Sequence, residues 1–170
     1  MLDTAATAAK KAGSIIKQGY GNLDSSDISL KGRGDFLTDI DNRSEEVIIG
    51  TIRDVYPDHS FLAEESGKQP GTGTWWIIDP LDGTSNFVHN IPLFAVSIAC
   101  MQDGELRCGV IYNPVKEEMF TAEKDGGAYL NGKKIRVNRK EQLGDCFLAT
   151  GFPWRDPDIV DSYLAGLKIF

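Results

Sequence analysis

The sequence has little of what several protein classes require. It contains two histidines and three cysteines, with no CxxC pair, so a zinc site is not expected, because zinc sites are built mainly from these residues. The odd number and unpaired spacing of Cys100, Cys108 and Cys146 predict reduced thiols, as in a cytoplasmic protein. The chain has no run of about 18 apolar residues that would cross a membrane, and residues 1–13 show no apolar core of a secretion signal.

The sequence also has fewer basic than acidic residues. The chain has 18 Lys and Arg against 25 Asp and Glu, which gives a formal net charge of −7. Since nucleic-acid phosphates attract Lys and Arg, direct binding of RNA or DNA is not expected. The 170 residues, of which 41% are hydrophobic, suffice for one globular domain with a core, and we expect it in the cytoplasm.

The first half of the chain mixes helical and strand patterns. Apolar residues at helical spacing predict helices over residues 3–20 and about 39–56. Short apolar runs predict buried strands at 61–63 and 75–78, with a loop containing Gly and Pro between them at 68–74.

The second half has the texture of an antiparallel meander. The Asp103-Gly104 and Asn131-Gly132 pairs are typical of tight turns between strands. The strands expected around these turns, the further strand and the final helix cover residues 94–101, 106–112, 119–122, 128–130, 134–137, 146–150 and 156–167. Helices followed by a meander predict an α+β domain, with helices packed on a sheet rich in antiparallel strands.

Acidic residues end two of the expected strands. Glu64 and Glu65 follow the first strand, and Asp79 and Asp82 follow the second. Carboxylates at one sheet end repel each other, so either one is protonated or a cation lies between them. Oxygen ligands without His or Cys favour Mg²⁺ or Mn²⁺, and the carbonyl of Leu81 could add a further ligand.

The residues Gly83-Thr84-Ser85-Asn86 come directly after the second pair of acids. If they open a short helix, the N–H groups of its first turn would attract an anion beside the cation. A metal next to such N–H groups suits a phosphate ester. Each motif alone is more often a helix cap or a solvated turn, so the functional interpretation depends on their combination.

The same residues resemble a known family. The run WIIDPLDGTSNF at residues 76–87 resembles the signature W-[IV]-[IV]-D-P-[IL]-D-G-T-x-N-F of the inositol monophosphatase family. Three other segments resemble family motifs in the family order: DFLTDID at 35–41, FLAEES at 61–66, where Ala63 replaces the usual Gly, and GAYLNG at 127–132.

The resemblance implies a set of metal ligands. Glu64, Asp79 and the carbonyl of Leu81 would bind a first Mg²⁺, and Asp79 and Asp82 would share a second. Glu64 would also contact a third, weakly held ion. The cofactor expected from the family is therefore two or three Mg²⁺ ions.

The resemblance also implies catalytic and substrate-binding roles. Asp41 and Thr84 would orient and deprotonate the attacking water, and Glu64 is counted with them as catalytic. Backbone N–H groups of Gly83 and Thr84 would bind the phosphate, while Asp82 would also face the substrate hydroxyls.

The sequence departs from the family pattern in its second half. The family has a C-terminal α/β portion with a W-D-x-A-[AG]-G segment, and no Trp-Asp pair follows residue 132 here. We therefore expect residues 1–170 to be the N-terminal metal- and phosphate-binding α+β domain of the layered αβαβα sandwich shared with fructose bisphosphatases. Such a fragment would be weakly active and would leave apolar surface of its last helix uncovered.

Three functions fit these expectations. The first is Mg²⁺-dependent hydrolysis of inositol monophosphate, with sensitivity to Li⁺ and a homodimer implied by the family. The second is hydrolysis of another phosphate, such as fructose bisphosphate, phosphoadenosine phosphate or histidinol phosphate. The third is a non-catalytic partner in a transcription complex, a role known among bacterial members of the family.

Overall fold

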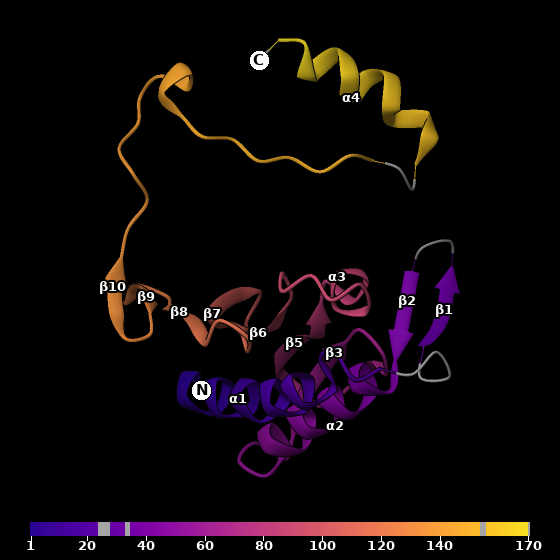
Figure 1. The fold of residues 1–170 in the computed structure, drawn as a ribbon. Coiled ribbons are helices and arrows are strands. Elements are labelled where there is room, and N and C mark those ends of the chain that lie inside the picture. The colour runs from indigo at the N-terminus through magenta and orange to yellow at the C-terminus, as the bar shows by residue number, and fades with distance from the viewer. Residues whose placement is uncertain (24–27, 33–34, 154–155, 170) are drawn as a thin grey trace. The chain divides into compact units, whose positions relative to one another are not determined.

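The computed structural model describes residues 1–23, 28–32, 35–153 and 156–169, and only the backbone of residues 30–32 and 35. The chain divides into two compact units, Met1–Arg136 and Val137–Phe170 (Figure 1). None of the described helices is long and apolar enough to cross a membrane.

The first unit is built on an eight-stranded sheet with the strand order β10-β9-β8-β7-β6-β5-β3-β4. All neighbours pair antiparallel except β3 and β5, which are parallel. The strands are β3 (His59–Ala63), β4 (Gly67–Gln69), β5 (Thr72–Asp82), β6 (Ala95–Gln102), β7 (Glu105–Asn113), β8 (Glu118–Glu123), β9 (Gly127–Leu130) and β10 (Lys133–Ile135). The predicted α+β class with an antiparallel-rich sheet is confirmed.

Two helices cover one face of this sheet (Figure 1). They are α1 (Leu2–Gly19) and α2 (Asp39–Arg53), close to the helices that the apolar spacing predicts. A separate hairpin of β1 (Ile28–Gly32) and β2 (Asp35–Thr38) precedes α2. The core between helices and sheet consists of fully buried side chains such as Ala8, Ala12, Ile16, Ile48, Ile52, Trp76, Val96, Ile98 and Val110.

Tight turns connect the strands of the meander as predicted. Asp103 and Gly104 have positive φ angles of 55° and 76°, and Asn131 and Gly132 have 48° and 78°. Two successive residues with positive φ are the signature of the turn type that matches the twist of a hairpin. The sequence pairs Asp-Gly and Asn-Gly adopt this conformation at little cost.

The strand that carries the site differs from its prediction. β5 runs from Thr72 to Asp82, whereas the sequence predicts a strand only at 75–78 and a loop at 68–74, which in fact contains β4 and the start of β5. Asp79 pairs with Ser97 and Asp82 with Ala95, with a register shift between them. Pro80 lies within this shift, where its lack of an N–H group removes no regular ladder bond.

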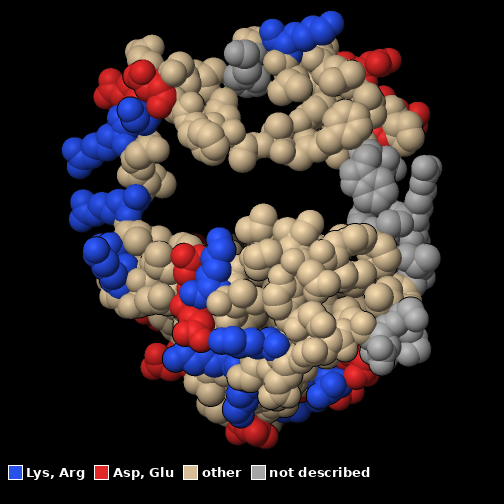
Figure 2. Space-filling model, in the orientation of Figure 1, with Lys and Arg blue, Asp and Glu red and all other residues tan. Residues whose placement is uncertain are grey.

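Surface charge in the first unit is mixed. On the face that Figure 2 shows, acidic and basic side chains of this unit are interspersed rather than separated by sign. One such pair, Lys17 on α1 and Glu117 between β7 and β8, is 2.8 Å apart. Exposed pairs of this kind contribute little to stability.

The second unit contains two short 3₁₀ turns, η2 (Leu143–Asp145) and η3 (Pro157–Ile159), and the helix α4 (Val160–Leu167). The final helix is confirmed, and none of its residues is buried. The strand predicted at 146–150 is wrong, because this segment has no strand assignment or pairing partner among the described residues. Its Phe147 is fully exposed, so the apolar pattern does not reflect burial in a sheet.

Candidate functional site

The predicted acids lie at one edge of the sheet because β3 and β5 are parallel neighbours. Parallel strands place their carboxyl ends side by side. The N–H group of Glu64 donates to the carbonyl of Ile78 at 3.1 Å, which holds the end of β3 against the residue preceding Asp79. The side chains of Glu64 and Asp82 are exposed, and that of Asp79 is half-buried.

Asp79 is the electrostatic centre of this edge. Its partial burial, the charge and hydrogen bond of Glu64, and the charge of Asp82 together raise the pKa of Asp79 to about 7. A hydrogen bond from the Leu81 N–H group to Oδ1 of Asp79, at 3.2 Å, opposes the rise. The three carboxylates therefore interact unfavourably when all are ionised, as the sequence predicts for acids gathered at one point.

Asp41 approaches the same edge from the first turn of α2. It is 2% exposed. Its Oδ2 accepts the N–H and hydroxyl groups of Thr38 at 2.8 and 2.6 Å, and its Oδ1 accepts the Thr84 hydroxyl at 3.0 Å. Burial raises the pKa of Asp41, and the bonds from Thr38 and Thr84 oppose that rise. The pairing of Asp41 with Thr84 joins α2 to the turn that follows β5.

This turn opens the short helix α3 (Thr84–Val88), as predicted. Gly83 is its N-cap residue with φ of 92°, and a Cβ atom there would lie 2.9 Å from the carbonyl oxygen of Leu93. Only glycine fits both constraints without strain. The Thr84 hydroxyl lies 3.0 Å from the carbonyl of Leu81 as well as from Asp41, so its single proton is shared between two acceptors.

The donor set suits a hard cation. Carboxylates of Glu64, Asp79 and Asp82 and the nearby carbonyl of Leu81 are oxygen ligands of the kind that Mg²⁺ takes. A cation would relieve the repulsion that, after burial, contributes to the raised pKa of Asp79. Within the described part of the chain, no group of three or more Asp, Glu, His or Cys side chains is arranged so that it could hold a metal ion. The predicted metal ligands therefore remain a prediction.

Sequence reasoning missed one buried acid of this region. Glu45 on α2 is 3% exposed. Its two carboxylate oxygens accept the backbone N–H groups of Glu65 and Ser66 at 2.7 and 2.8 Å. The signal in the sequence is an acid four residues after Asp41, on the face of α2 that also carries the buried Ile48 and Ile52.

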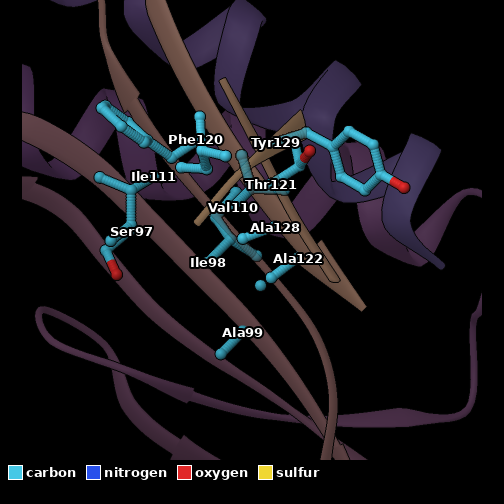
Figure 3. Close-up of a pocket in the computed structure, with 12 residues that line it drawn as sticks. Ser97, Ile98, Ala99, Val110, Ile111, Phe120, Thr121, Ala122, Ala128 and Tyr129 are labelled. Carbon is cyan, nitrogen blue, oxygen red and sulfur yellow. The ribbon is translucent and has the colours of Figure 1, made fainter. Parts of the chain in front are cut away.

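Of two hollows on the described part of the first unit, one adjoins the acids. A cavity of about 350 Å³ is lined by Asp82 and Gly83 together with polar Asn86, Asn113 and Glu118. Figure 3 shows another, of about 320 Å³, across the strands β6 to β10. It is lined mainly by apolar side chains, and none of the predicted site residues belongs to it.

These features define an α+β protein whose sheet edge gathers carboxylates beside a glycine turn. Residues 1–165 match the inositol monophosphatase family. The chain is 44% identical over 166 residues to Nus factor SuhB of Escherichia coli (strain K12), covering 96% of this chain and 62% of that protein. The chain belongs to the inositol monophosphatase family.

Solved structures support the same fold. Extragenic suppressor protein SuhB from Bartonella henselae superimposes with a TM-score of 0.90 at 40% identity, covering 98% of this chain and 64% of that one. SaIMPase-II, solved with inositol monophosphate bound, has a TM-score of 0.76 at 26% identity, covering 96% and 59%. The chain thus spans less than two thirds of the length of these relatives.

Proposed function

We propose that the protein hydrolyses a small phosphate monoester with Mg²⁺, with inositol monophosphate as the first candidate substrate. The observation that carries this proposal is the position of Asp79, whose pKa is raised to about 7 by its partial burial and by the nearby Glu64 and Asp82. Family membership and the similarity to a structure with inositol monophosphate bound support it.

In this proposal Glu64, Asp79, Asp82 and the carbonyl of Leu81 hold two or three Mg²⁺ ions. When bound, such ions polarise phosphoryl oxygens, lower the pKa of a coordinated water and stabilise the leaving oxygen. The chain's own contribution is to hold the carboxylates close together, whereas the cations would favour their ionised form. The end of β3 is fixed for this purpose by the bond from Glu64 to Ile78.

Asp41 and Thr84 activate the attacking water. The Thr84 hydroxyl donates a hydrogen bond to Asp41, 3.0 Å away, and its oxygen can accept a hydrogen bond from the water. As the water attacks, its proton passes to Thr84 while the Thr84 proton passes to Asp41. Burial raises the pKa of Asp41, and a carboxylate with a raised pKa is a better proton acceptor. Glu64 is counted with these residues as catalytic.

The turn after β5 binds the substrate. Backbone N–H groups of Gly83 and Thr84 face the phosphate, because the first turn of a helix leaves such groups without helical partners. Exposed Asp82 accepts hydrogen bonds from substrate hydroxyls. Asp82 also lines the cavity of about 350 Å³, where the alcohol portion would lie.

Phosphate release from inositol 1-phosphate, measured with and without Mg²⁺, tests the proposal. We expect release that requires Mg²⁺ and is abolished in Asp79→Asn but retained in Glu46→Gln, since Glu46 is an exposed acid on α2. Fructose bisphosphate, phosphoadenosine phosphate and histidinol phosphate are the substrates to compare. An unchanged rate in Asp79→Asn contradicts the assignment of the metal site.

A second candidate function is participation in a transcription complex, because several relatives at 42 to 44% identity are named Nus factors. In that case Asp79→Asn leaves co-purification with RNA polymerase intact, whereas the hydrolytic proposal predicts loss of phosphate release. The two readouts together separate the functions.

Three further properties are proposed from the family alone. They are inhibition by Li⁺, a homodimer and a cytoplasmic location. Phosphate release in a Li⁺ series, light scattering coupled to size exclusion, and cell fractionation test them in turn.

A further inference from the structure

Glu45 has no part in any of the roles described above. Its side chain lies on α2 and is 3% exposed, and an ionised carboxylate is costly to bury unless it is hydrogen-bonded. Both of its oxygens are used: Oε2 accepts from Glu65 N–H at 2.7 Å and Oε1 from Ser66 N–H at 2.8 Å.

The N–H groups that donate to Glu45 come from the turn that directly follows Glu64. This turn connects β3 to β4, which pair antiparallel from Phe61 with Gln69 to Ala63 with Gly67. On its other side, Glu64 N–H donates to the carbonyl of Ile78. The backbone around Glu64 is therefore tied both to β5 and, through Glu45, to α2.

The same helix face also holds the second half of the site. Asp41 precedes Glu45 by four residues, so both point from one side of α2. Asp41 accepts the hydroxyl of Thr84, which follows β5, while Glu45 accepts N–H groups of the turn that follows β3. One helix thus fixes the ends of both strands that carry the acids.

We infer that Glu45 is a positioning residue that holds the turn after β3 so that Glu64 stays beside Asp79 and Asp82. The inference deepens the proposed function and rests on it. Because the three carboxylates repel each other when no cation is bound, the turn would relax outward unless the backbone were held. A Gln at this position has one acceptor oxygen and an NH₂ group that faces the second N–H, so it cannot replace the two bonds.

The test measures Mn²⁺ binding to the protein by isothermal titration, with Mn²⁺ as a probe for the Mg²⁺ site. We expect Glu45→Gln to raise the Kd roughly 10- to 100-fold, the usual cost of removing a group that orients a metal ligand. Glu46→Gln, which changes the adjacent exposed acid, should leave the Kd unchanged. Amide hydrogen exchange at Glu65 and Ser66 should accelerate in Glu45→Gln only.

Glu45→Asp separates hydrogen bonding from charge. It keeps the negative charge but is one methylene shorter, so it cannot reach both N–H groups, and we expect weakened binding here too. Wild-type affinity in Glu45→Asp would show that charge alone matters and would overturn the inference.

Two further outcomes are decisive. A lower melting temperature in Glu45→Gln with an unchanged Kd assigns Glu45 a merely structural role and overturns the inference alone. Wild-type protein that takes up no Mn²⁺ overturns the proposed function, and the inference with it.

Discussion

Two groups of carboxylates lie a short distance apart in this protein and differ in how they are satisfied. Asp41 and Glu45 on α2 are almost fully buried, and both oxygens of each accept hydrogen bonds from the protein. Glu64, Asp79 and Asp82 at the sheet edge are exposed or half-buried, and partial burial together with the charges of Glu64 and Asp82 raises the pKa of Asp79 to about 7.

The difference separates carboxylates that anchor the backbone from carboxylates that are kept for function. A buried carboxylate with a full set of donors stabilises the local backbone. Carboxylates that destabilise each other persist where a function requires them, and perturbed pKa values accordingly gather at functional sites. Substitutions in the α2 pair and its partners should therefore cost stability in addition to any loss of activity or metal affinity, whereas substitutions at the sheet edge should cost activity and leave or improve stability.

The largest expected effect is on catalysis at the sheet edge. Asp79→Asn should lower phosphate release from inositol 1-phosphate by at least about a thousandfold, since metal stabilisation of the reacting charges supplies several kcal/mol. The melting temperature of the metal-free variant should not fall, because the substitution removes a repelling charge. If circular dichroism shows that the inactive variant is also unfolded, the proposed difference between the sheet-edge and α2 carboxylates is contradicted.

A smaller loss of activity is expected at Thr84, which connects the α2 carboxylates to the sheet edge. Thr84→Ala removes the hydroxyl that lies 3.0 Å from Asp41 and from the Leu81 carbonyl. Its phosphate release should fall by about a hundredfold, the lower range for proton transfer by a positioned group, while the Kd for Mn²⁺ stays close to wild type. Ser85→Ala, one residue further along α3, serves as the control with retained activity.

Much of this arrangement could be predicted from local sequence. The apolar spacing of α1 and α2 and the Asp-Gly and Asn-Gly turns report the helices and the meander directly, because these signals depend on neighbouring residues. The motif at residues 76–87 indicates where the acids gather. The pairing of Asp41 with Thr84 was implied by the family resemblance and not by the spacing of the residues.

The features that sequence reasoning missed depend on distant partners. Glu45 looks like a solvated acid of a helix, because its acceptor role becomes visible only when backbone N–H groups 20 and 21 residues away are placed beside it. The segment 146–150 has the composition of a strand, but a strand requires a neighbour to pair with, and composition does not supply one. The extension of β5 through Pro80 depends on a register shift against β6.

A moderate loss of stability is expected when a hydrogen bond to the buried carboxylates of α2 is removed. Thr38→Val removes a buried hydroxyl that donates to Asp41 at 2.6 Å, so we expect a loss of about 1–3 kcal/mol in the free energy of unfolding. Urea denaturation followed by circular dichroism measures it. Thr7→Val, on the exposed face of α1, should change stability far less, and equal losses in both variants would contradict the anchoring role.

The smallest effect tests the electrostatic strain at the sheet edge through pH. An aspartate in the unfolded chain ionises near pH 3.9, whereas the pKa of Asp79 in the folded protein is raised to about 7. Between these values the folded chain binds a proton that the unfolded chain has released, so stability falls as pH rises through this window.

Metal-free protein in a chelating buffer should therefore melt a few degrees lower at pH 8 than at pH 5. Asp79→Asn should reduce this pH dependence of the melting temperature. A smaller dependence of the same sign should remain, since burial also raises the pKa of Asp41. Mg²⁺ should oppose the decline in wild type alone, because the cation binds the ionised carboxylates. Identical slopes in wild type and Asp79→Asn would mean that the edge carboxylates are as well satisfied as those of α2, and the distinction between anchoring and functional acids would fail.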